Sequence, residues 1–212
     1  MNKRALIVLN GEIEPALPLV KREDYQLIIA VDGAINTLLD QGWTPDVLLG
    51  DFDSVSDLAM QVALEAEVKV IHTPDQDFTD FEKALRLPEI QDVTDIDLIG
   101  HSGRRLDHTL GSLYAAISLA DRFKFRLIDP AGTGYLVPGG EMLPLKDQVD
   151  NLCSVLGLVP SIVSLDGFQW PLQDAEIGGL NKQSISNIIV SENARIRVTK
   201  GAVLVYLPRA ES

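Results

Sequence analysis

Leu27-Ile28-Ile29-Ala30-Val31, followed at once by Asp32-Gly33, is the stretch that decides the fold of this chain. Five consecutive apolar residues, three of them β-branched, are typical of a strand buried on both faces, as strands of a parallel sheet are. A helical pattern begins directly after the glycine, at Ala34–Asp40. A strand followed by a helix is the repeating unit of an α/β sheet.

The same alternation extends outward from this run and fills residues 1–130. We expect strands at Ala5–Leu9, Leu27–Val31, Val47–Leu49, Val68–Ile71, Ile96–Ile99 and Phe125–Ile128. Helical patterns lie between them at Ala34–Asp40, Ser56–Glu65, Thr79–Arg86 and Asp107–Asp121. This order predicts βαβ units and a mostly parallel sheet.

After Pro130 the pattern changes to short apolar or alternating segments separated by Gly, Pro, Asn and Asp. Candidate strands are Gly134–Val137, Leu152–Leu156, Ile162–Leu165, Ser186–Val190, Ala194–Thr199 and Ala202–Leu207. Their spacing is typical of a small β-sandwich. The sequence therefore predicts an α/β domain over residues 1–130 and an all-β, sandwich-like domain over residues 131–212.

Composition narrows the class of protein. The chain is 46% hydrophobic and 23% charged, as globular proteins are, and it has no window of about 18 uninterrupted apolar residues that could cross a membrane. The run Ala5–Leu9 follows basic residues, as in a signal peptide, but it is short and lacks a cleavage site, so we interpret it as the first strand. The single Cys153 fits a reducing cytosol. We expect a soluble, cytoplasmic protein.

The charge of the chain argues against a nucleic-acid partner, and it is concentrated in residues 1–130. The net charge of −13 is unlike a nucleic-acid-binding surface, which gathers Lys and Arg. Residues 1–130 hold 12 of the basic and 23 of the acidic residues, so most of the excess negative charge lies in the α/β part. This charge can serve solubility alone, and the positions of the acids decide whether it does more.

Acidic residues follow successive expected strands. Asp32 follows the second strand, the third runs into Gly50-Asp51-Phe52-Asp53-Ser54, and later strands lead into 75–83 and 100–108. Ligands of open parallel sheets bind beyond the carboxyl ends of the strands. Carboxylates gathered there would repel one another unless cations neutralise them. Together with Lys83 and Arg105, they favour a magnesium-nucleotide site.

Asp51 and Asp53 are candidate metal ligands. In extended chain, residues two apart project to the same side, with Phe52 facing the other way. Mg²⁺ prefers oxygen ligands and often combines one or two carboxylates with substrate phosphates and water. The alternative is a strand end at which Asp51 only caps a turn.

The segment around Asp80 carries a second candidate pair. Asp77 and Asp80 are three apart at an expected helix start, where they would share a face. A structural interpretation competes, because Thr79-Asp80-Phe81-Glu82 is a capping box and acids favour the first turn of a helix. Lys83 would either neutralise phosphate or pair with a neighbouring acid.

Gly103 to His108 joins a glycine loop to two arginines and an acid at the start of a helix. Arg is suited to bidentate phosphate binding, and a helix N-terminus attracts anions. The alternatives are that Asp107 is a simple N-cap and His108 a first-turn histidine. The sequence has no P-loop, and His72 and His101 lack the spacing of metal ligands.

Taken in order, these stretches resemble the thiamin pyrophosphokinase family, whose members transfer the pyrophosphoryl group of ATP to thiamin. The matching stretches are Val31–Ala34, Gly50–Ser54, Thr79–Leu85, Arg105–His108, Gly167–Leu172 and Ser184–Asn187. They lie between Val31 and Asn187, so the resemblance extends over nearly the whole chain. The implied reaction is in-line attack by the thiamin hydroxyl on the β-phosphorus of ATP, with AMP leaving.

The resemblance implies roles for particular residues. Mg²⁺ and the ATP phosphates would be held by Asp51, Asp53, Asp80 and Asp107, with Lys83 and Arg105 offsetting phosphate charge. The nucleotide would also meet Asp32, Gly33, Asn36, Asp77, Thr79 and His108. Thiamin would bind at the interface of a homodimer, near Trp170, Ser184, Ser186 and Asn187.

Trp170 would stack on the thiazolium ring, a cation–π contact of about 0.5–2 kcal/mol. The alternative for Trp170 is an ordinary core or interface tryptophan.

One departure from the family matters, whereas those at Val31 and Ile35 are neutral changes. Members usually read Gly-Gly-Arg before Leu-Asp-His, whereas this chain has Gly103-Arg104-Arg105. A side chain at position 104 either restricts the approach of the loop to phosphate or adds a contact, and the sequence leaves both open.

Two rival functions are a phosphohydrolase that forms an aspartyl-phosphate and a non-enzymatic sensor of thiamin or nucleotide. The aspartate pair of such hydrolases usually follows the first strand, and a sensor would not need the full set of acids.

Overall fold

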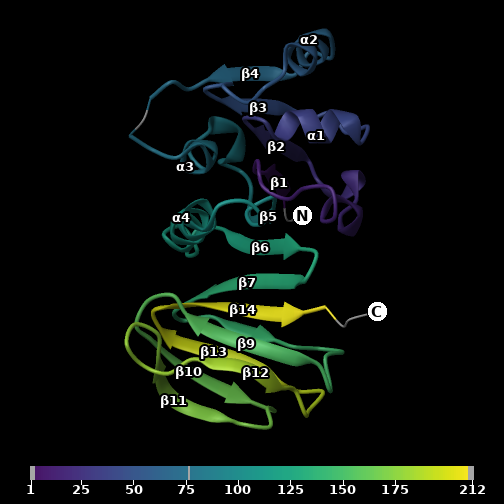
Figure 1. Ribbon diagram of the computed structural model, residues 1–212. Coiled ribbons are helices and arrows are strands. Elements are labelled where there is room, and N and C mark those ends of the chain that lie inside the picture. The colour runs from purple at the N-terminus through teal and green to yellow at the C-terminus, as the bar shows by residue number, and fades with distance from the viewer. Residues whose placement is uncertain (1–2, 76, 210–212) are drawn as a thin grey trace. The chain divides into compact units, whose positions relative to one another are not determined.

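The computed structural model describes residues 3–75 and 77–209, and the chain divides into two compact units. The first unit comprises residues up to Ala115 together with Phe125–Pro130. The second comprises Ala116–Lys124 together with the residues from Ala131 onward. Helices and strands alternate in the first unit, whereas the second is built almost entirely of strands (Figure 1).

The first unit is an α/β sheet with the order β6-β5-β1-β2-β3-β4. Its strands are β1 (Arg4–Val8), β2 (Leu27–Val31), β3 (Val47–Gly50), β4 (Lys69–His72), β5 (Asp95–Ile99) and β6 (Lys124–Asp129). Its α-helices are α1 (Ala34–Asp40), α2 (Asp57–Glu65), α3 (Asp80–Ala84) and α4 (Leu106–Ile117), with 3-10 turns at Leu17–Leu19, Arg22–Asp24 and Pro88–Ile90. The pairs β5–β1, β1–β2, β2–β3 and β3–β4 are all parallel, which confirms the predicted sheet.

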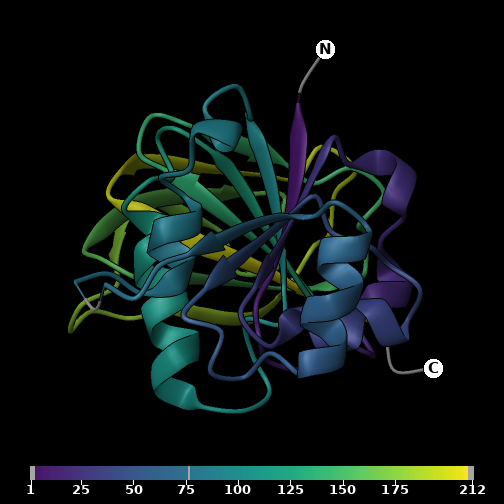
Figure 2. The same cartoon turned by 90° about the horizontal axis from the view of Figure 1, so that it is seen from above.

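Both faces of this sheet are buried. Leu6, Ile28 and Leu48 point to one face and pack with apolar residues of α1 and α2. Their neighbours Ile7 and Ile29 point to the other face and are also fully buried. Figure 2 shows the blue α2 and the teal α4 on opposite sides of the strands. Helices on both faces explain why β2 is apolar throughout.

The second unit is a β-sandwich, as predicted. Its strands are β7 (Gly132–Pro138), β8 (Met142–Pro144), β9 (Leu152–Gly157), β10 (Ser161–Asp166), β11 (Leu172–Ile177), β12 (Ser184–Ile188), β13 (Arg195–Lys200) and β14 (Ala202–Pro208). Antiparallel pairs join β12-β9-β14-β7 and, separately, β11-β10-β13-β8. Val155 and Val205 from the first group share a core with Val163 and Val198 from the second.

The largest differences from the expectation concern β8, β11 and α4, while α3 and β12 differ only in their bounds. β8 and β11 were not predicted, because β8 is three residues long and β11 reads Leu-Gln-Asp-Ala-Glu-Ile, a mostly polar edge strand. α4 ends at Ile117 rather than Asp121, because after Ile117 the backbone tightens into hydrogen bonds spanning three residues, such as Leu119 N–H to Ala116 O.

Within 3–75 and 77–209, no helix is long and apolar enough to span a membrane.

Candidate active site

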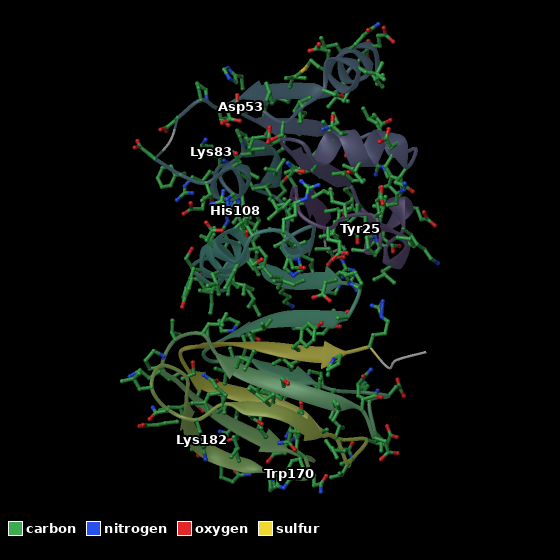
Figure 3. All side chains as sticks on the ribbon, in the orientation of Figure 1. Tyr25, Asp53, Lys83, His108, Trp170 and Lys182 are labelled. Atoms are coloured by element: carbon green, nitrogen blue, oxygen red, sulfur yellow. The ribbon has the colours of Figure 1, made fainter. Side chains whose placement is uncertain are left out.

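A cavity of about 490 Å³ opens in the first unit where the parallel strands end. Its lining comes from the segments that follow β1, β2, β3 and β5 and from the starts of α3 and α4. Among the described residues, its charged side chains apart from histidine are Asp32, Asp51, Asp80, Lys83, Arg104, Arg105 and Asp107. Figure 3 shows Asp53, Lys83 and His108 on one side of this unit. Acids from separate loops therefore meet at the sheet edge where ligands bind in such folds.

Asp32 directly follows β2 in a backbone conformation that side chains rarely adopt. Its φ is +49°, and its N–H donates to the Leu49 carbonyl at 2.7 Å. The carboxylate oxygen Oδ1 is buried and has no hydrogen-bond partner within the described part of the chain. A buried oxygen of this kind is costly unless a cation or a donor joins it, so Asp32 is suited to a ligand in the cavity.

Asp51 and Asp53 do not lie on extended chain, which corrects the expectation from their spacing. β3 ends at Gly50, and Phe52 has a φ of +70°, because its ring turns inward onto the core and against His72 at 5.3 Å between centroids. The Asp53 N–H donates to Asp51 Oδ1 at 3.2 Å. Asp51 lines the cavity, whereas Asp53 is not among the described lining residues.

Asn36 and Gly33 shape the loops beside the cavity and are not among its described lining residues. The Asn36 amide donates to the Ser54 carbonyl at 2.8 Å and accepts from the Ser56 N–H at 3.0 Å. Gly33 is the N-cap of α1, where a Cβ would come within 2.6 Å of Asn10 Nδ2. Both residues thus hold the segments that carry Asp32 and Asp51.

The predicted capping box starts α3. Thr79 Oγ1 accepts from the Glu82 N–H at 3.3 Å, and Glu82 accepts from the Thr79 N–H at 2.8 Å. This places Asp80 in the first turn, where Lys83 donates to its Oδ1 at 3.0 Å and to the Thr73 carbonyl at 2.9 Å. The helix positions an acid and a base side by side at the cavity.

The spacing of Asp77 and Asp80 predicted that they share a helical face, and this prediction is wrong. Asp77 lies before the N-cap and is outside the helix. Its N–H donates to Asp75 Oδ1 at 2.9 Å, in a turn outside the helix. It is not one of the described residues of the cavity lining.

Arg105 and Asp107 form an exposed ion pair at the start of α4. Arg105 Nε donates to Asp107 Oδ1 at 3.1 Å, which lowers the pKa of Asp107 to about 2 and raises that of Arg105. Asp107 is the second residue of the helix, so the N-cap interpretation is wrong. The neighbouring His108 lines the cavity, and its N–H donates to Asp107 at 3.0 Å.

The donor set fits a hard cation in chemistry but is not preassembled. Among the described residues, no three Asp, Glu, His or Cys side chains form a ready metal cluster. Asp80 and Asp107 are instead paired with Lys83 and Arg105. Carboxylate oxygens are the ligands that Mg²⁺ prefers. The buried Asp32 Oδ1, which has no hydrogen-bond partner among the described residues, is suited to bind a cation or a hydrogen-bond donor. A metal would replace the lysine and arginine as the partner of the acids.

In the second unit, Asn187 fixes the backbone of Trp170. The buried Asn187 amide donates to the Trp170 carbonyl at 2.8 Å and accepts from its N–H at 3.1 Å, and it also donates to Ser184 Oγ at 3.3 Å. Ser186 has a φ of +53°, at a register shift in β12. Trp170 is 56% exposed, so it is not a core tryptophan. Figure 3 shows its side chain at the surface of the second unit.

Two family models match the chain in succession. The first, described as thiamin pyrophosphokinase, catalytic domain, covers residues 21–127, and the second, thiamin pyrophosphokinase, vitamin B1 binding domain, covers residues 143–203. The chain belongs to the thiamin pyrophosphokinase family. It is thus an enzyme that transfers the pyrophosphoryl group of ATP to thiamin, giving thiamin diphosphate and AMP.

Relatives and solved structures agree with this membership. The thiamine pyrophosphokinase of Bacillus subtilis is 29% identical over 86% of this chain and 87% of its own length, and that of Caenorhabditis elegans is 25% identical over 82% and 76%. The crystal structure of the Bacillus subtilis protein superposes with a TM-score of 0.83, at 26% identity, over 99% of this chain and all of that one. The yeast thiamin pyrophosphokinase shares the fold, with a TM-score of 0.81 at 19% identity over 98% and 86%.

The structure adds residues that the thiamin pyrophosphokinase motifs did not bring out. Asn10, Phe78 and His101 line the cavity. Asn10 could have been found, because it follows the first expected strand just as Asp32 follows the second. His101 is buried, which lowers its pKa, and its Nδ1 has no partner within the described residues. Phe78 carries the Arg86 guanidinium 3.9 Å above its ring, a contact without a signal in the sequence.

Proposed function

We propose that this chain carries out the family reaction in the cavity of the first unit, with Mg²⁺ as its metal. Asp51, Asp53, Asp80 and Asp107 are the proposed carboxylates for Mg²⁺ and the ATP phosphates, and Lys83 and Arg105 the proposed phosphate-binding cations. Bound Mg²⁺ would neutralise phosphate charge. The observation that carries this proposal is the pairing of Asp80 with Lys83 and of Asp107 with Arg105 on the wall of one cavity.

An exchange of partners explains how these pairs would serve catalysis. With Mg²⁺ and a polyphosphate bound, Asp80 and Asp107 would face the cation, and Lys83 and Arg105 would bind phosphate oxygens. Each of these four side chains would then keep a partner of opposite charge. Lys83 is held by the Thr73 carbonyl as well as by Asp80, so its ammonium group stays in place while its partner changes. Lys83 is therefore in position before substrate arrives, which favours a reaction that depends on positioning.

The chemical step needs positioning and charge neutralisation more than a strong base. The thiamin hydroxyl oxygen forms a bond to the β-phosphorus of ATP, and the bond from that phosphorus to the bridging oxygen of the α-phosphate breaks, so AMP leaves with that oxygen. The hydroxyl proton passes to water or to a carboxylate. Lys83 and Arg105 would stabilise the charge that develops on the phosphate oxygens.

For thiamin we propose the exposed indole of Trp170 as the stacking surface, near Ser184 and Ser186. Asn187 uses both ends of its amide on neighbouring groups, so it would position Trp170 rather than contact thiamin. We further propose a homodimer with thiamin at the subunit interface. Large apolar side chains exposed on α4, namely Leu106, Leu110 and Tyr114, support this proposal.

Product analysis by mass spectrometry tests the proposal, with purified protein, ATP, Mg²⁺ and thiamin. We expect thiamin diphosphate and AMP in equal amounts. Asp51→Asn should lower kcat/KM by roughly 10²-fold or more, as for a lost electrostatic contact to the reacting phosphates. Trp170→Ala should raise the KM for thiamin roughly twofold to thirtyfold, since about 0.5–2 kcal/mol of cation–π energy is lost.

Asp92→Asn is the matched control, because Asp92 is an exposed acid paired with Lys3 outside the cavity. It should leave both constants unchanged. Orthophosphate as the product would favour a phosphohydrolase. Binding of thiamin without turnover would favour a sensor, and either outcome would overturn the proposed roles.

A further inference from the structure

Arg104 differs from the other cationic side chains at the cavity, Lys83 and Arg105, because its hydrogen-bond partner is uncharged. Lys83 and Arg105 each donate to a carboxylate, whereas Arg104 Nη1 donates to the neutral Asn10 Oδ1 at 3.2 Å. Within residues 3–75 and 77–209, no carboxylate lies in ion-pair distance of its guanidinium. Arg104 lines the same cavity as Asp32, Asp51, Asp80 and Asp107. Its charge is available to an anionic ligand.

The backbone around Arg104 is held in place by close contacts. Gly103 has a φ of +97°, and a Cβ there would lie 2.4 Å from Glu12 Cβ. The Glu12 N–H donates to the Ser102 carbonyl at 2.8 Å, which joins the loop after β5 to the loop after β1. The residue after Gly103 therefore leaves a fixed loop at the cavity, so a side chain at this position is directed by its backbone.

Asn10 orients the guanidinium without neutralising it. Its amide lies against the loop after β2, where a Cβ on Gly33 would come within 2.6 Å of Asn10 Nδ2. Its Oδ1 takes one donor of Arg104. A guanidinium has five N–H donors in a planar fork, so those on Nε and Nη2 remain for a bidentate contact to a phosphate.

We propose that Arg104 binds the polyphosphate chain of the nucleotide and raises the preference of the site for ATP over AMP. This inference rests on the proposed function of the cavity. Lys83 and Arg105 become phosphate-binding cations only when a metal takes over their acids, whereas Arg104 already lacks an acid. Its contact is to phosphates that AMP does not carry, so it favours the substrate over the leaving product. The side chain at position 104 thus adds a contact to the loop.

Calorimetric binding to the full chain, in Mg²⁺ and without thiamin, tests this inference. We expect Arg104→Gln and Arg104→Gly to raise the Kd for ATP about tenfold, the effect of losing one charge-assisted hydrogen bond at a partly exposed site. The Kd for AMP should stay unchanged, and Arg104→Lys should give an intermediate Kd for ATP because it keeps the charge but loses the fork. In turnover, the KM for ATP should rise while kcat is kept.

Arg22→Gln is the matched control, since Arg22 pairs with Asp46 before β3, at the opposite end of the strands. It removes the same charge and should leave both Kd values unchanged. An unchanged Kd for ATP in Arg104→Gln, or an equal rise for ATP and AMP, would overturn the inference. Wild-type protein that makes no thiamin diphosphate would instead overturn the proposed function, while the comparison of ATP with AMP still decides the role of Arg104.

Discussion

Asp97 is a buried charge in β5 that the proposed reaction does not use. The residue is 1% exposed, and its carboxylate accepts from Tyr25 Oη at 2.7 Å and from Arg126 Nε at 2.9 Å. Burial and the hydrogen bond to Asp97 raise the pKa of Tyr25, so the phenol stays protonated. The network joins β5, β6 and the segment before β2, which makes Asp97 a structural residue of the sheet.

We therefore predict that Asp97→Ala destabilises the protein by about 3 kcal/mol, because removing one partner leaves buried polar groups without their acceptor. Urea unfolding of the purified variant measures this loss. Tyr25→Phe, which removes only one hydrogen bond, should cost about 1 kcal/mol. Equal losses in the two variants would show that Asp97 acts through the tyrosine alone.

His101 gives the protein a pH-dependent stability. Burial lowers its pKa below the ordinary value of about 6.5, despite the opposing charge of Asp129. The folded state thus holds the neutral imidazole, while the unfolded state takes up a proton as pH falls through about 6.5. The stability contributed by His101 is present above that pH and is lost as pH falls towards its folded pKa.

We predict that the free energy of unfolding falls between pH 7.5 and pH 5.5 and falls less in His101→Asn, which cannot take up the proton. Urea unfolding across this range at constant ionic strength measures both slopes. Parallel slopes in the two proteins would mean that other groups cause the decline.

At the scale of elements, α3 connects local sequence to the site. It is five residues long, too short to be stable by itself, and its capping box fixes where it begins. We predict that Thr79→Ala costs about 1 kcal/mol of stability and lowers kcat/KM for ATP about tenfold. The reason is that the first turn of α3, which positions Asp80 and Lys83, is no longer fixed by its N-cap. Thermal unfolding and steady-state kinetics measure the two effects.

Ser56→Ala is the control for this prediction. Ser56 caps α2 in the same way, accepting from the Ala59 N–H at 3.1 Å, and is not one of the described lining residues. It should lose similar stability with unchanged kinetics. Kinetics unchanged in Thr79→Ala as well would contradict a positioning role for the cap.

Elements with a local signal were predictable, and those fixed by tertiary contacts were not. α1 was predicted at its observed bounds. The starts of α2 and α3 were predicted at Ser56 and Thr79, which are their N-caps in the structure. By contrast, the left-handed turn at Phe52 follows from the burial of its ring, which the spacing of Asp51 and Asp53 does not reveal. β11 escaped notice because an exposed edge strand needs no alternation of apolar residues.

For the whole molecule, the topology of the sheet allowed the location of the site to be predicted from the sequence. The pairing of its side chains could not be predicted in the same way. Parallel strands bring their carboxyl ends to one edge, so acids distant in sequence could be assigned to one cavity. Which acid meets which base depends on loop geometry, and the sequence left Lys83 open between phosphate and a neighbouring acid. The structure pairs it with Asp80.

The proposed homodimer leads to a prediction about the α4 face. Leu106, Leu110 and Tyr114 recur every four residues, so they lie on one side of the helix, and all three are exposed. We predict a solution mass of two chains, and a monomer for Leu110→Asp, because a charge cannot be buried in an apolar interface without a partner. Light scattering after size exclusion measures the mass.

The same variant separates the two halves of the reaction. Because the cavity lies within one unit of one chain, Leu110→Asp should still bind ATP, whereas thiamin at a subunit interface would be lost and the KM for thiamin should rise steeply. Leu58→Asp on α2, where Leu58 is even more exposed than Leu110, should change neither mass nor kinetics. A monomeric Leu110→Asp variant with an unchanged KM for thiamin would place the thiamin site within a single chain.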